Sequence, residues 1–135
     1  ALEVVVATGR PLAAWQRERG EPPLLDGVGT QCLVIEPDRE LLHRRIEQRL
    51  DAMVEAGALA EVEALLAQGL DPALPAMKAI GVREFGDHLK GLKSLDAAIA
   101  KARTETRRYA KRQSTWFRHQ MAHWQRIDPA DADAG

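Results

Sequence analysis

Apolar side chains recur at three- and four-residue intervals from residue 38 onward, which predicts a succession of amphipathic helices. Asp38 is the expected N-cap of the first helix, Gly57 interrupts the pattern, and Gly69 ends it. The side chains expected to face inward over this stretch are Leu42, Ile46, Leu50, Met53, Val54, Leu59, Val62, Leu65 and Leu66.

A further helix is predicted over residues 76–89, and its inward side chains are expected to be Met77, Ile80, Phe85 and Leu89. It contains Gly81 and Gly86, and glycine inside a helix costs about 1 kcal/mol relative to alanine. Gly81 therefore indicates either close approach by a ligand or another backbone, or a loose packing contact. The pattern alone leaves both open.

Shorter apolar runs predict strands. Ala1–Thr8 is rich in β-branched residues, so propensity alone predicts a strand there. Gln31–Ile35 lacks polar alternation, which predicts a strand buried on both faces, as in a parallel sheet. Residues 123–128 are expected to form one more short strand. Pro11 is expected to open a short helix through Trp15, and residues 20–30 a loop.

The longest predicted helix is Ser94–Gln120, which contains no Gly or Pro and would be roughly 40 Å long. Ser94 is its expected N-cap. At about 100° per residue, one arc is expected to pack against the protein. That arc carries Leu95, Ile99, Ala102, Thr106, Tyr109, Gln113, Trp116 and Phe117. Most of the basic residues, together with Thr115, fall on the opposite arc.

Positive charge is concentrated in this helix. Lys101–Arg118 contains seven Lys or Arg residues and one acid, Glu105, whereas the whole chain has 19 basic and 20 acidic residues and a net charge of −1. Solvated helix faces normally mix opposite charges four residues apart, and the run is interpreted as lacking this mixture. Arginine suits bidentate phosphate contacts. The pattern therefore favours polyanion binding over a merely solvated face.

Composition limits the possible classes of protein. With 135 residues and 45% hydrophobic content the chain is expected to form at most one globular domain, and the dominance of Ala and Leu over the scarce aromatic residues favours helices. The single cysteine, Cys32, excludes an internal disulfide and fits a reducing cytosol. No stretch is apolar enough for a membrane span, and no signal peptide is recognised. Because the chain begins at Ala1 without Met, we expect it to be a piece of a longer protein.

Recognised catalytic motifs are absent from the sequence: there is no GxxxxGK[ST], GxSxG, HExxH or CxxC. His119 and His123 lack a third ligand, and Cys32 and His43 are isolated, so no zinc site is expected. The arginines are chemically more suggestive, because Arg83, close to Gly81, suits a phosphate clamp.

Three further residues of the basic helix attract attention. Gln113 stands among apolar residues, so it is either specifically hydrogen-bonded or a tolerated edge residue. Thr115 lies among cations, where a hydroxyl can add a phosphate contact. Trp116 is expected in the core rather than as a base-stacking platform.

Residues 111–118, KRQSTWFR, resemble the KRQxTWxR signature of tRNA dimethylallyltransferases. Further similar stretches, in matching order, are ALEVVVATGRPLAAWQ at 1–16, PDRELLHRRIEQRLDAMVEAGALAEVEAL at 37–65, KAIGVREF at 78–85 and SLDAAIAKARTETRRYAKRQ at 94–113. The resemblance covers roughly residues 1–127. It implies a helix at residues 1–8 in place of the strand that propensity predicts. Val82 departs from the family's usual Tyr, a change expected to be tolerated.

The resemblance implies an α/β fold, of which this chain is the mainly helical C-terminal part: a P-loop-type parallel-sheet fold with a long basic C-terminal helix and one or two short strands. Residues 1–128 are expected to form the C-terminal portion of the transferase core, followed by a disordered tail at 129–135. Three parts of the family have no counterpart here. They are the P-loop (a motif of the nucleotide-binding and ATP-binding type that holds the donor diphosphate), the aspartate base and the inserted helical domain. No catalytic residue and no metal ligand are therefore expected in this chain.

The resemblance also implies roles for individual residues. Arg83 would neutralise the leaving diphosphate, and Lys111, Arg112 and Arg118 would hold the anticodon-loop backbone. Gln113 and Thr115 would fix the register around a flipped-out adenosine, and Trp116 would anchor the helix. The whole implied tRNA-binding set is Lys78, Gly81, Arg83, Arg108, Lys111, Arg112, Gln113, Thr115, Trp116 and Arg118.

The implied activity is a cytoplasmic transfer of a dimethylallyl group from dimethylallyl diphosphate to N6 of the adenosine next to the anticodon, with Mg²⁺ as the cofactor of the full enzyme. The implied partners are the tRNA anticodon stem-loop, the prenyl donor and the missing N-terminal half, without a membrane. The chain alone is expected to fold, to be inactive, and to self-associate through exposed strand edges. Two alternatives are a helical RNA-binding module without chemistry and a basic helix that docks an acidic protein.

Overall fold

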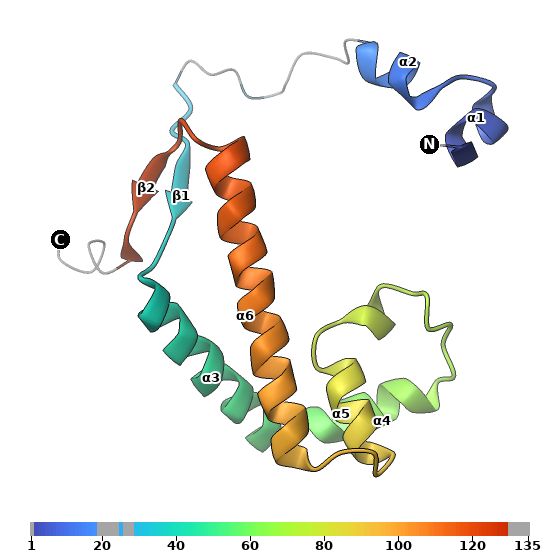
Figure 1. Ribbon diagram of the computed structural model, residues 1–135, viewed down its shortest axis with the longest axis vertical. Helices are drawn as coiled ribbons and strands as arrows, with labels where there is room; N and C mark the ends of the chain where they lie inside the picture. Colours follow the sequence, from blue (N-terminus) through green and yellow to red (C-terminus); the bar gives the residue numbers. More distant parts are fainter. Residues whose placement is uncertain (1, 19–24, 26–28, 130–135) are drawn as a thin grey trace. The chain divides into compact units, whose positions relative to one another are not determined.

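The computed structural model describes residues 2–18, 25 and 29–129, and separates into two compact units, Ala1–Cys32 and Leu33–Gly135 (Figure 1). The predicted loop at residues 20–30 falls largely outside the described residues, as do residues 130–135 of the predicted tail. Among the described residues, no helix combines the length and the apolar character that crossing a membrane requires.

The first unit contains helices α1 (Leu2–Thr8) and α2 (Leu12–Arg17). The strand that propensity predicts at residues 1–8 is wrong, and the helix that the resemblance implies there is confirmed. Strand propensity reflects packing of branched side chains on a pleated surface. In this unit Leu2 and Val6 are 77% and 80% exposed, so no such surface supports a strand. The short helix predicted after Pro11 is confirmed as α2.

The second unit is mainly helical. Its elements are β1 (Leu33–Ile35), α3 (Arg39–Glu55), α4 (Ala58–Ala67), the 3₁₀ turn η1 (Ala76–Lys78), α5 (Val82–Leu89), α6 (Leu95–Gln120) and β2 (Gln125–Ile127). Helix α6 runs along the unit, with α3 packed against it on one side and α5 packed against its beginning (Figure 1). The predicted mainly helical architecture with two short strands is confirmed.

The two strands form a parallel sheet in which Val34 lies opposite Arg126. Both predicted strands and their parallel direction are thus confirmed. Burial on both faces is wrong, because Val34 is 4% exposed but Ile35 is 68% exposed. A strand with one neighbour and one covered face buries only its inward side chain.

Side chains at the helix ends explain where α3 and α6 begin. The Asp38 carboxylate accepts hydrogen bonds from the backbone N–H groups of Glu40 at 2.9 Å and Leu41 at 3.0 Å. These bonds, the one from Leu41 above all, lower the pKa of Asp38. Ser94 Oγ accepts from Ala97 N at 3.2 Å. Both predicted N-caps are therefore confirmed.

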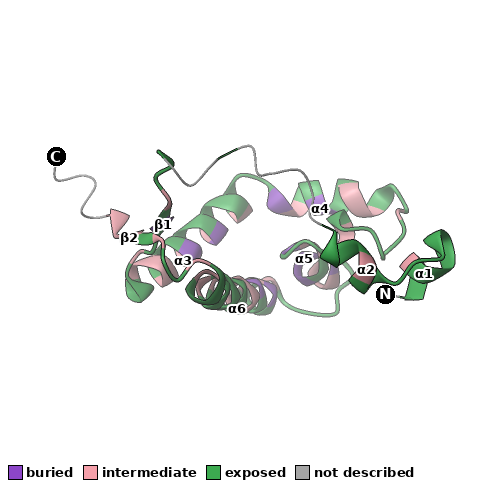
Figure 2. Cartoon of the chain, turned by 90° about the horizontal axis from the view of Figure 1, so that it is seen from above, coloured by how far each residue is buried: buried purple, intermediate pink, exposed green. Residues whose placement is uncertain are grey.

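Two hydrophobic clusters hold the second unit together, and buried positions on α3, α4, α5 and α6 are marked in Figure 2. The first cluster joins α4, α5 and the start of α6 through Ala58, Val62, Phe85 and Ala98. The second joins α3 to α6 through Ile46, Leu50 and Ala102. Ala98 and Ala102 are both fully buried, and their small side chains let neighbouring helices approach α6 closely.

The packed face of α6 changes direction along the helix. Trp116 lies about five turns after Ala98 and so points the same way. The α4–α5 cluster, however, packs against the start of α6, at Leu95, Ala98 and Ile99. Farther along, α3 packs against Ala102 and Ala110 instead. The predicted inward positions Tyr109, Gln113 and Trp116 are therefore exposed, and so is Met53 on α3.

The predicted helix over residues 76–89 is broken in two. Ala79 has an extended backbone and Gly81 a φ of +104°, which only glycine adopts without strain, so α5 begins at Val82. Phe85 is 1% exposed, as predicted, whereas Ile80 and Leu89 are about 40% exposed. Because of the break, the side chains before and after Gly81 do not lie on one face of a single helix.

Candidate nucleic-acid interface

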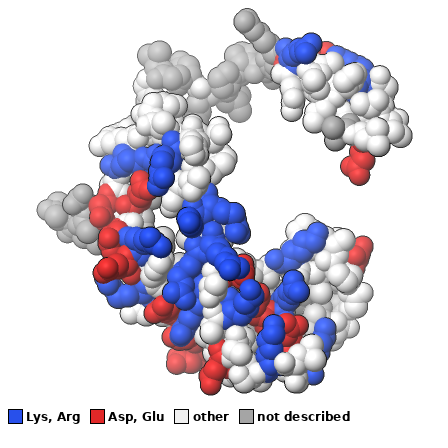
Figure 3. Space-filling model, viewed as in Figure 1, with Lys and Arg blue, Asp and Glu red and all other residues white. Residues whose placement is uncertain are grey.

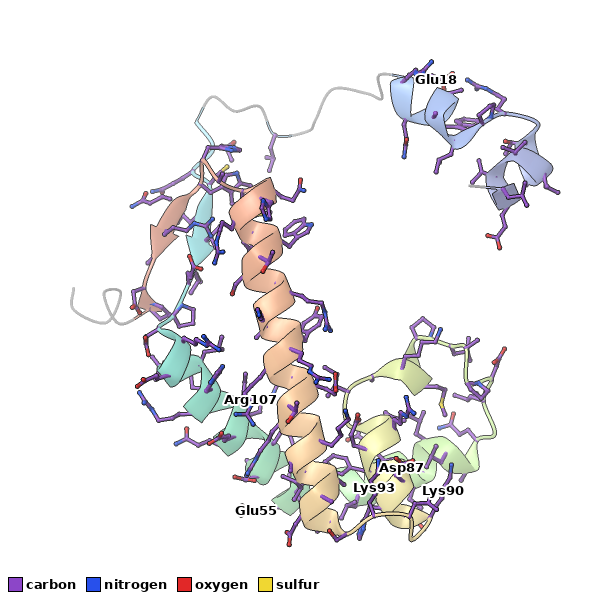
Figure 4. The ribbon with its side chains drawn as sticks, in the orientation of Figure 1. Glu18, Glu55, Asp87, Lys90, Lys93 and Arg107 are labelled. Carbon is purple, nitrogen blue, oxygen red and sulfur yellow. The ribbon has the colours of Figure 1, made fainter. Side chains whose placement is uncertain are left out.

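Lys and Arg side chains gather along α6, and several of them are ion-paired (Figure 3). Arg103 Nη2 lies 2.5 Å from Asp51 of α3, and Arg107 Nη1 lies 3.9 Å from Glu47 of α3. Arg107 projects from α6 toward α3 (Figure 4). The interpretation that the basic face lacks a mixture of opposite charges is therefore wrong, because Lys101 and Glu105 pair four residues apart within the run and α3 supplies further acids. The acids of α3 are remote in sequence, and tertiary packing brings them close.

Glu105 is the acid within the run itself. Its Oε1 lies 2.8 Å from both Lys101 Nζ and Arg108 Nη1. The hydrogen bond from Lys101 is the main cause that lowers the pKa of Glu105, and the charge of Arg108 acts in the same direction. Glu105 therefore remains a carboxylate and offsets part of the positive charge of both residues.

Three cations in the second half of α6 form no ion pair within the described residues. Lys111, Arg112 and Arg118 are exposed, and within the described part of the chain no acid comes within ion-pair distance of them. The Arg112 guanidinium lies over the ring of Tyr109, 5.7 Å from its centroid. These residues therefore carry the uncompensated positive charge of the helix.

A groove on the α5 side of α6, hereafter the α5-side groove, has a volume of about 800 Å³. Its cationic lining comes from Lys78, Arg83, Lys90, Lys93, Lys101 and Arg112. Arg83 and Arg112, 29 positions apart, thus face the same groove. Lys90 and Lys93 were missed by the sequence analysis, although both stand in the short connection between the two predicted helices.

Gly81 sets the position of Arg83 at the beginning of α5. The buried Glu84 carboxylate accepts a hydrogen bond from Gly81 N–H at 2.9 Å, which closes the turn. A Cβ at Gly81 would meet the Phe85 ring at 3.4 Å, an ordinary contact, so the positive φ is what requires glycine. Of the two readings of Gly81, close backbone approach does not apply within this chain. At Gly86 a side chain comes close instead, because a Cβ there would lie 3.2 Å from Cδ1 of Leu66 in α4.

Farther along the α5-side groove, Lys93 and Asp87 form an ion pair at 2.8 Å, and they lie with Lys90 at the end of α5 (Figure 4). The hydrogen bond from Lys93 is the main cause that lowers the pKa of Asp87, and the charges of Arg83 and Lys90 add to it. Asp87 remains ionised, so it pairs with Lys93 and offsets part of the positive charge of Arg83 and Lys90, neither of which is ion-paired to it.

A second groove, hereafter the α3-side groove, has a volume of about 560 Å³ and lies between α6 and the start of α3. It brings together four predicted site residues, namely Arg108, Lys111, Thr115 and Arg118. Thr115 Oγ1 donates its proton to the Lys111 carbonyl at 2.9 Å. In this conformation the hydroxyl has no proton left to donate to a phosphate oxygen. Arg39 and His43 of α3 also line this groove and were missed as site residues, because they lie 62 and 58 residues before Lys101, the first residue of the basic run.

Trp116 lies beside a third hollow, of about 480 Å³, lined by Lys111, Arg112, Thr115, Trp116, His119 and Gln120. The indole is 52% exposed, so the prediction that Trp116 belongs to the core is wrong for this chain. It makes an edge-to-face contact with Phe117, with ring centroids 5.5 Å apart. Gln113 is exposed and lines none of the three hollows.

Metal ligands do not gather in the part of the chain that the structure describes, where no three His, Cys, Asp or Glu side chains could hold a metal ion together. Cys32 is a free thiol. The site is therefore a cationic surface built around α6.

Comparison with known proteins identifies this architecture. A family model described as IPP transferase matches residues 1–120. The chain belongs to the IPP transferase family. Curated relatives named tRNA dimethylallyltransferase include one from Mesorhizobium japonicum, 55% identical over 132 residues, and one from Caulobacter sp. (strain K31), 54% identical over 128 residues. These alignments cover 97% and 95% of this chain but 41% of each relative.

Solved structures of IPP transferases share the fold. A tRNA isopentenylpyrophosphate transferase from Bacillus halodurans superposes with a TM-score of 0.66 at 35% identity, over 75% of this chain and 34% of that one. The corresponding enzyme from Staphylococcus epidermidis gives 0.67 at 32% identity, over 95% and 41%. The chain thus spans about two fifths of the length of the relatives that it matches.

Proposed function

We propose that this chain is the C-terminal, substrate-binding part of a cytoplasmic tRNA dimethylallyltransferase, and that it works with an N-terminal half that supplies the chemical groups. The observation that carries the proposal is the convergence of Arg83 and Arg112 on one groove in a member of the IPP transferase family. Relatives 50–55% identical to this chain are named tRNA dimethylallyltransferase. The reaction is the transfer of a dimethylallyl group from dimethylallyl diphosphate to N6 of the adenosine beside the anticodon.

Arg83 is assigned to the diphosphate of the donor. It stands at the first turn of α5, its guanidinium is exposed toward the α5-side groove, and the described acids leave it unpaired at ion-pair distance. Negative charge grows on the diphosphate as the allylic carbon–oxygen bond breaks. A fixed guanidinium beside that oxygen therefore stabilises the transition state more than the ground state.

The anticodon stem-loop is assigned to α6. Lys111, Arg112 and Arg118 offer uncompensated charge to the phosphate backbone, and Lys78 and Arg108 add charge at the two grooves. Gly81 positions the turn, and Gln113 and Thr115 are assigned to the register of the loop around the reacting adenosine. Because Trp116 is exposed beside these cations, we assign its indole to stacking on an unpaired base rather than to anchoring the helix.

Mg²⁺ is the cofactor proposed for the full enzyme, where it would neutralise diphosphate charge. The described residues of this chain do not fit a magnesium site, since no three potential ligands come together. Magnesium would therefore be held by the other half of the enzyme and by the donor diphosphate. Residues 1–128 would then be one portion of the transferase core, as the sequence resemblance implies.

Binding of the chain to an anticodon stem-loop RNA tests the proposal. With four to six phosphates contacted, log K should fall with log salt at a slope of roughly −3 to −5. The measurement is a fluorescence-anisotropy titration from low to physiological salt. Affinity that does not change with salt would exclude the α6 cations as an RNA surface and would favour the protein-docking alternative.

Replacing Trp116 by alanine should weaken RNA binding by about 5- to 150-fold, because stacking of one base contributes about 1–3 kcal/mol. Thermal unfolding should change little, since the indole is half-exposed. Trp124, half-buried near the end of the chain and outside all three hollows, provides the matched control as Trp124→Phe. A Trp116→Ala chain that unfolds without losing RNA affinity when folded would instead assign the indole to packing.

A further inference from the structure

We infer that the α3-side groove is a second phosphate-binding site, in which Arg39 and His43 of α3 act with the cations of α6. The inference rests on the proposed function for its RNA source of phosphate but adds two residues of α3 that are not in the implied tRNA-binding set. The groove shares no lining residue with the α5-side groove that holds Arg83. It is therefore a separate place for an anion.

The charges lining this groove are strongly biased. Arg39, Lys111 and Arg118 line it without an acid at ion-pair distance among the described residues. Glu36 is the acid in the lining, and Arg126 Nη1 lies 3.5 Å from its Oε2. Its charge is thus already compensated from outside the groove. Arg107 and Arg108 add further positive charge, partly offset by Glu47 and Glu105.

The position of the groove in the fold supports a ligand site. Glu36 and Pro37 follow directly on the carboxyl end of β1, and both line the groove. In open α/β sheets, ligands bind outside the carboxyl ends of the parallel strands. The packing of Ile46 and Leu50 on Ala102 fixes α3 against α6, so the groove is held open by a hydrophobic contact rather than by the ligand.

The third hollow links the two grooves across α6. Lys111 and Thr115 line both this hollow and the α3-side groove, whereas Arg112 lines both the hollow and the α5-side groove. A polyanion with successive phosphates can therefore follow one cationic path over the helix, whereas a free diphosphate would occupy one groove alone. RNA and diphosphate both present phosphate groups to this site, and binding measurements with each ligand distinguish the two.

The test replaces Arg39, which is exposed and unpaired within the described chain, by glutamine and measures two ligands: an anticodon stem-loop RNA and inorganic diphosphate. Arg45→Gln on the same helix is the matched control, since Arg45 is exposed, likewise unpaired, and lines none of the three hollows. We expect Arg39→Gln to weaken at least one ligand roughly tenfold and to lower the RNA salt slope by about 1 if RNA is the source. Arg45→Gln should change neither.

The double variant Arg39→Gln/Arg118→Gln should weaken binding by less than the product of the two single effects, because both side chains would hold one phosphate. Equal effects of Arg39→Gln and Arg45→Gln, or no binding of either ligand by the unaltered chain, would overturn the site. If RNA binding depends on Arg112 but not on Arg39, the proposed function stands and this inference fails. If Arg39→Gln weakens diphosphate binding and the unaltered chain does not bind RNA, this inference stands and the proposed function fails.

Discussion

Replacing Arg83 by alanine in a full-length enzyme carrying this sequence is expected to slow the prenyl-transfer step about 10- to 150-fold. A charge-assisted hydrogen bond contributes about 1.5–3 kcal/mol, and the charge on the leaving diphosphate grows in the transition state. The fold should survive, because the side chain is exposed and makes no ion pair within the described chain. The measurement is the single-turnover rate at saturating tRNA and donor.

Arg112→Ala is the matched variant, since Arg112 lines the same groove but also the hollow beside Trp116. It should weaken tRNA binding by a comparable factor and lower the salt slope by about 1, with the single-turnover rate nearly unchanged. An Arg83→Ala enzyme whose chemical step runs at the unaltered rate would refute the assignment of Arg83 to the diphosphate. Slowing of the chemical step by both variants alike would mean that the groove holds one ligand, not two.

Replacing Phe85 by alanine should cost about 3–5 kcal/mol of folding free energy, the second large effect that we expect. Among the residues that the structure describes, Phe85 is the largest fully buried side chain, and it joins α5 to α4 and α6. A typical domain is stable by only about 5–15 kcal/mol, so this loss is a large fraction of the total. Urea unfolding followed by circular dichroism measures it.

Leu92→Ala is the control for Phe85, because Leu92 is 69% exposed and its loss should change stability by less than about 0.5 kcal/mol. Phe85 also lies under the turn at Gly81, with its ring 3.4 Å from where a Cβ would stand. Its removal should therefore disorganise the Arg83 groove even where α3 and α6 stay packed. A Phe85→Ala chain as stable as Leu92→Ala would show that the first hydrophobic cluster does not hold the unit together.

Local signals in the sequence predicted where α3 and α6 begin, but not where α5 begins. Asp38 and Ser94 cap helices because their side chains reach the backbone N–H groups two or three residues ahead, a contact that needs no tertiary information. The first strand was predictable from a short apolar run, whereas β2 lies in a mostly polar segment. At residues 1–8, propensity alone gave the wrong element, and the resemblance of the surrounding motif gave the right one.

Burial was predicted less well, because it depends on which neighbour lies beside each turn. Helical periodicity puts Trp116 on the same side of α6 as the buried Ala98. However, α4 and α5 cover only the start of the helix, and α3 covers another side farther along. The ion pairs of Arg103 and Arg107, and the presence of Arg39 beside Lys111, likewise depend on how α3 packs. Sequence spacing cannot contain these contacts.

The two hydrophobic clusters meet α6 at Ala98 and Ala102, one turn apart, and the helix then runs without interruption to Gln120. Because the helix is continuous, the angular position of each residue beyond Ala102 is set by the number of residues that separate it from these contacts. A single inserted residue just after Ala102 would turn Lys111 and Arg118 by about 100° and displace them by about 1.5 Å. Changes in length are thus tolerable in the connections around this helix, whereas inside it they would dismantle both grooves at once.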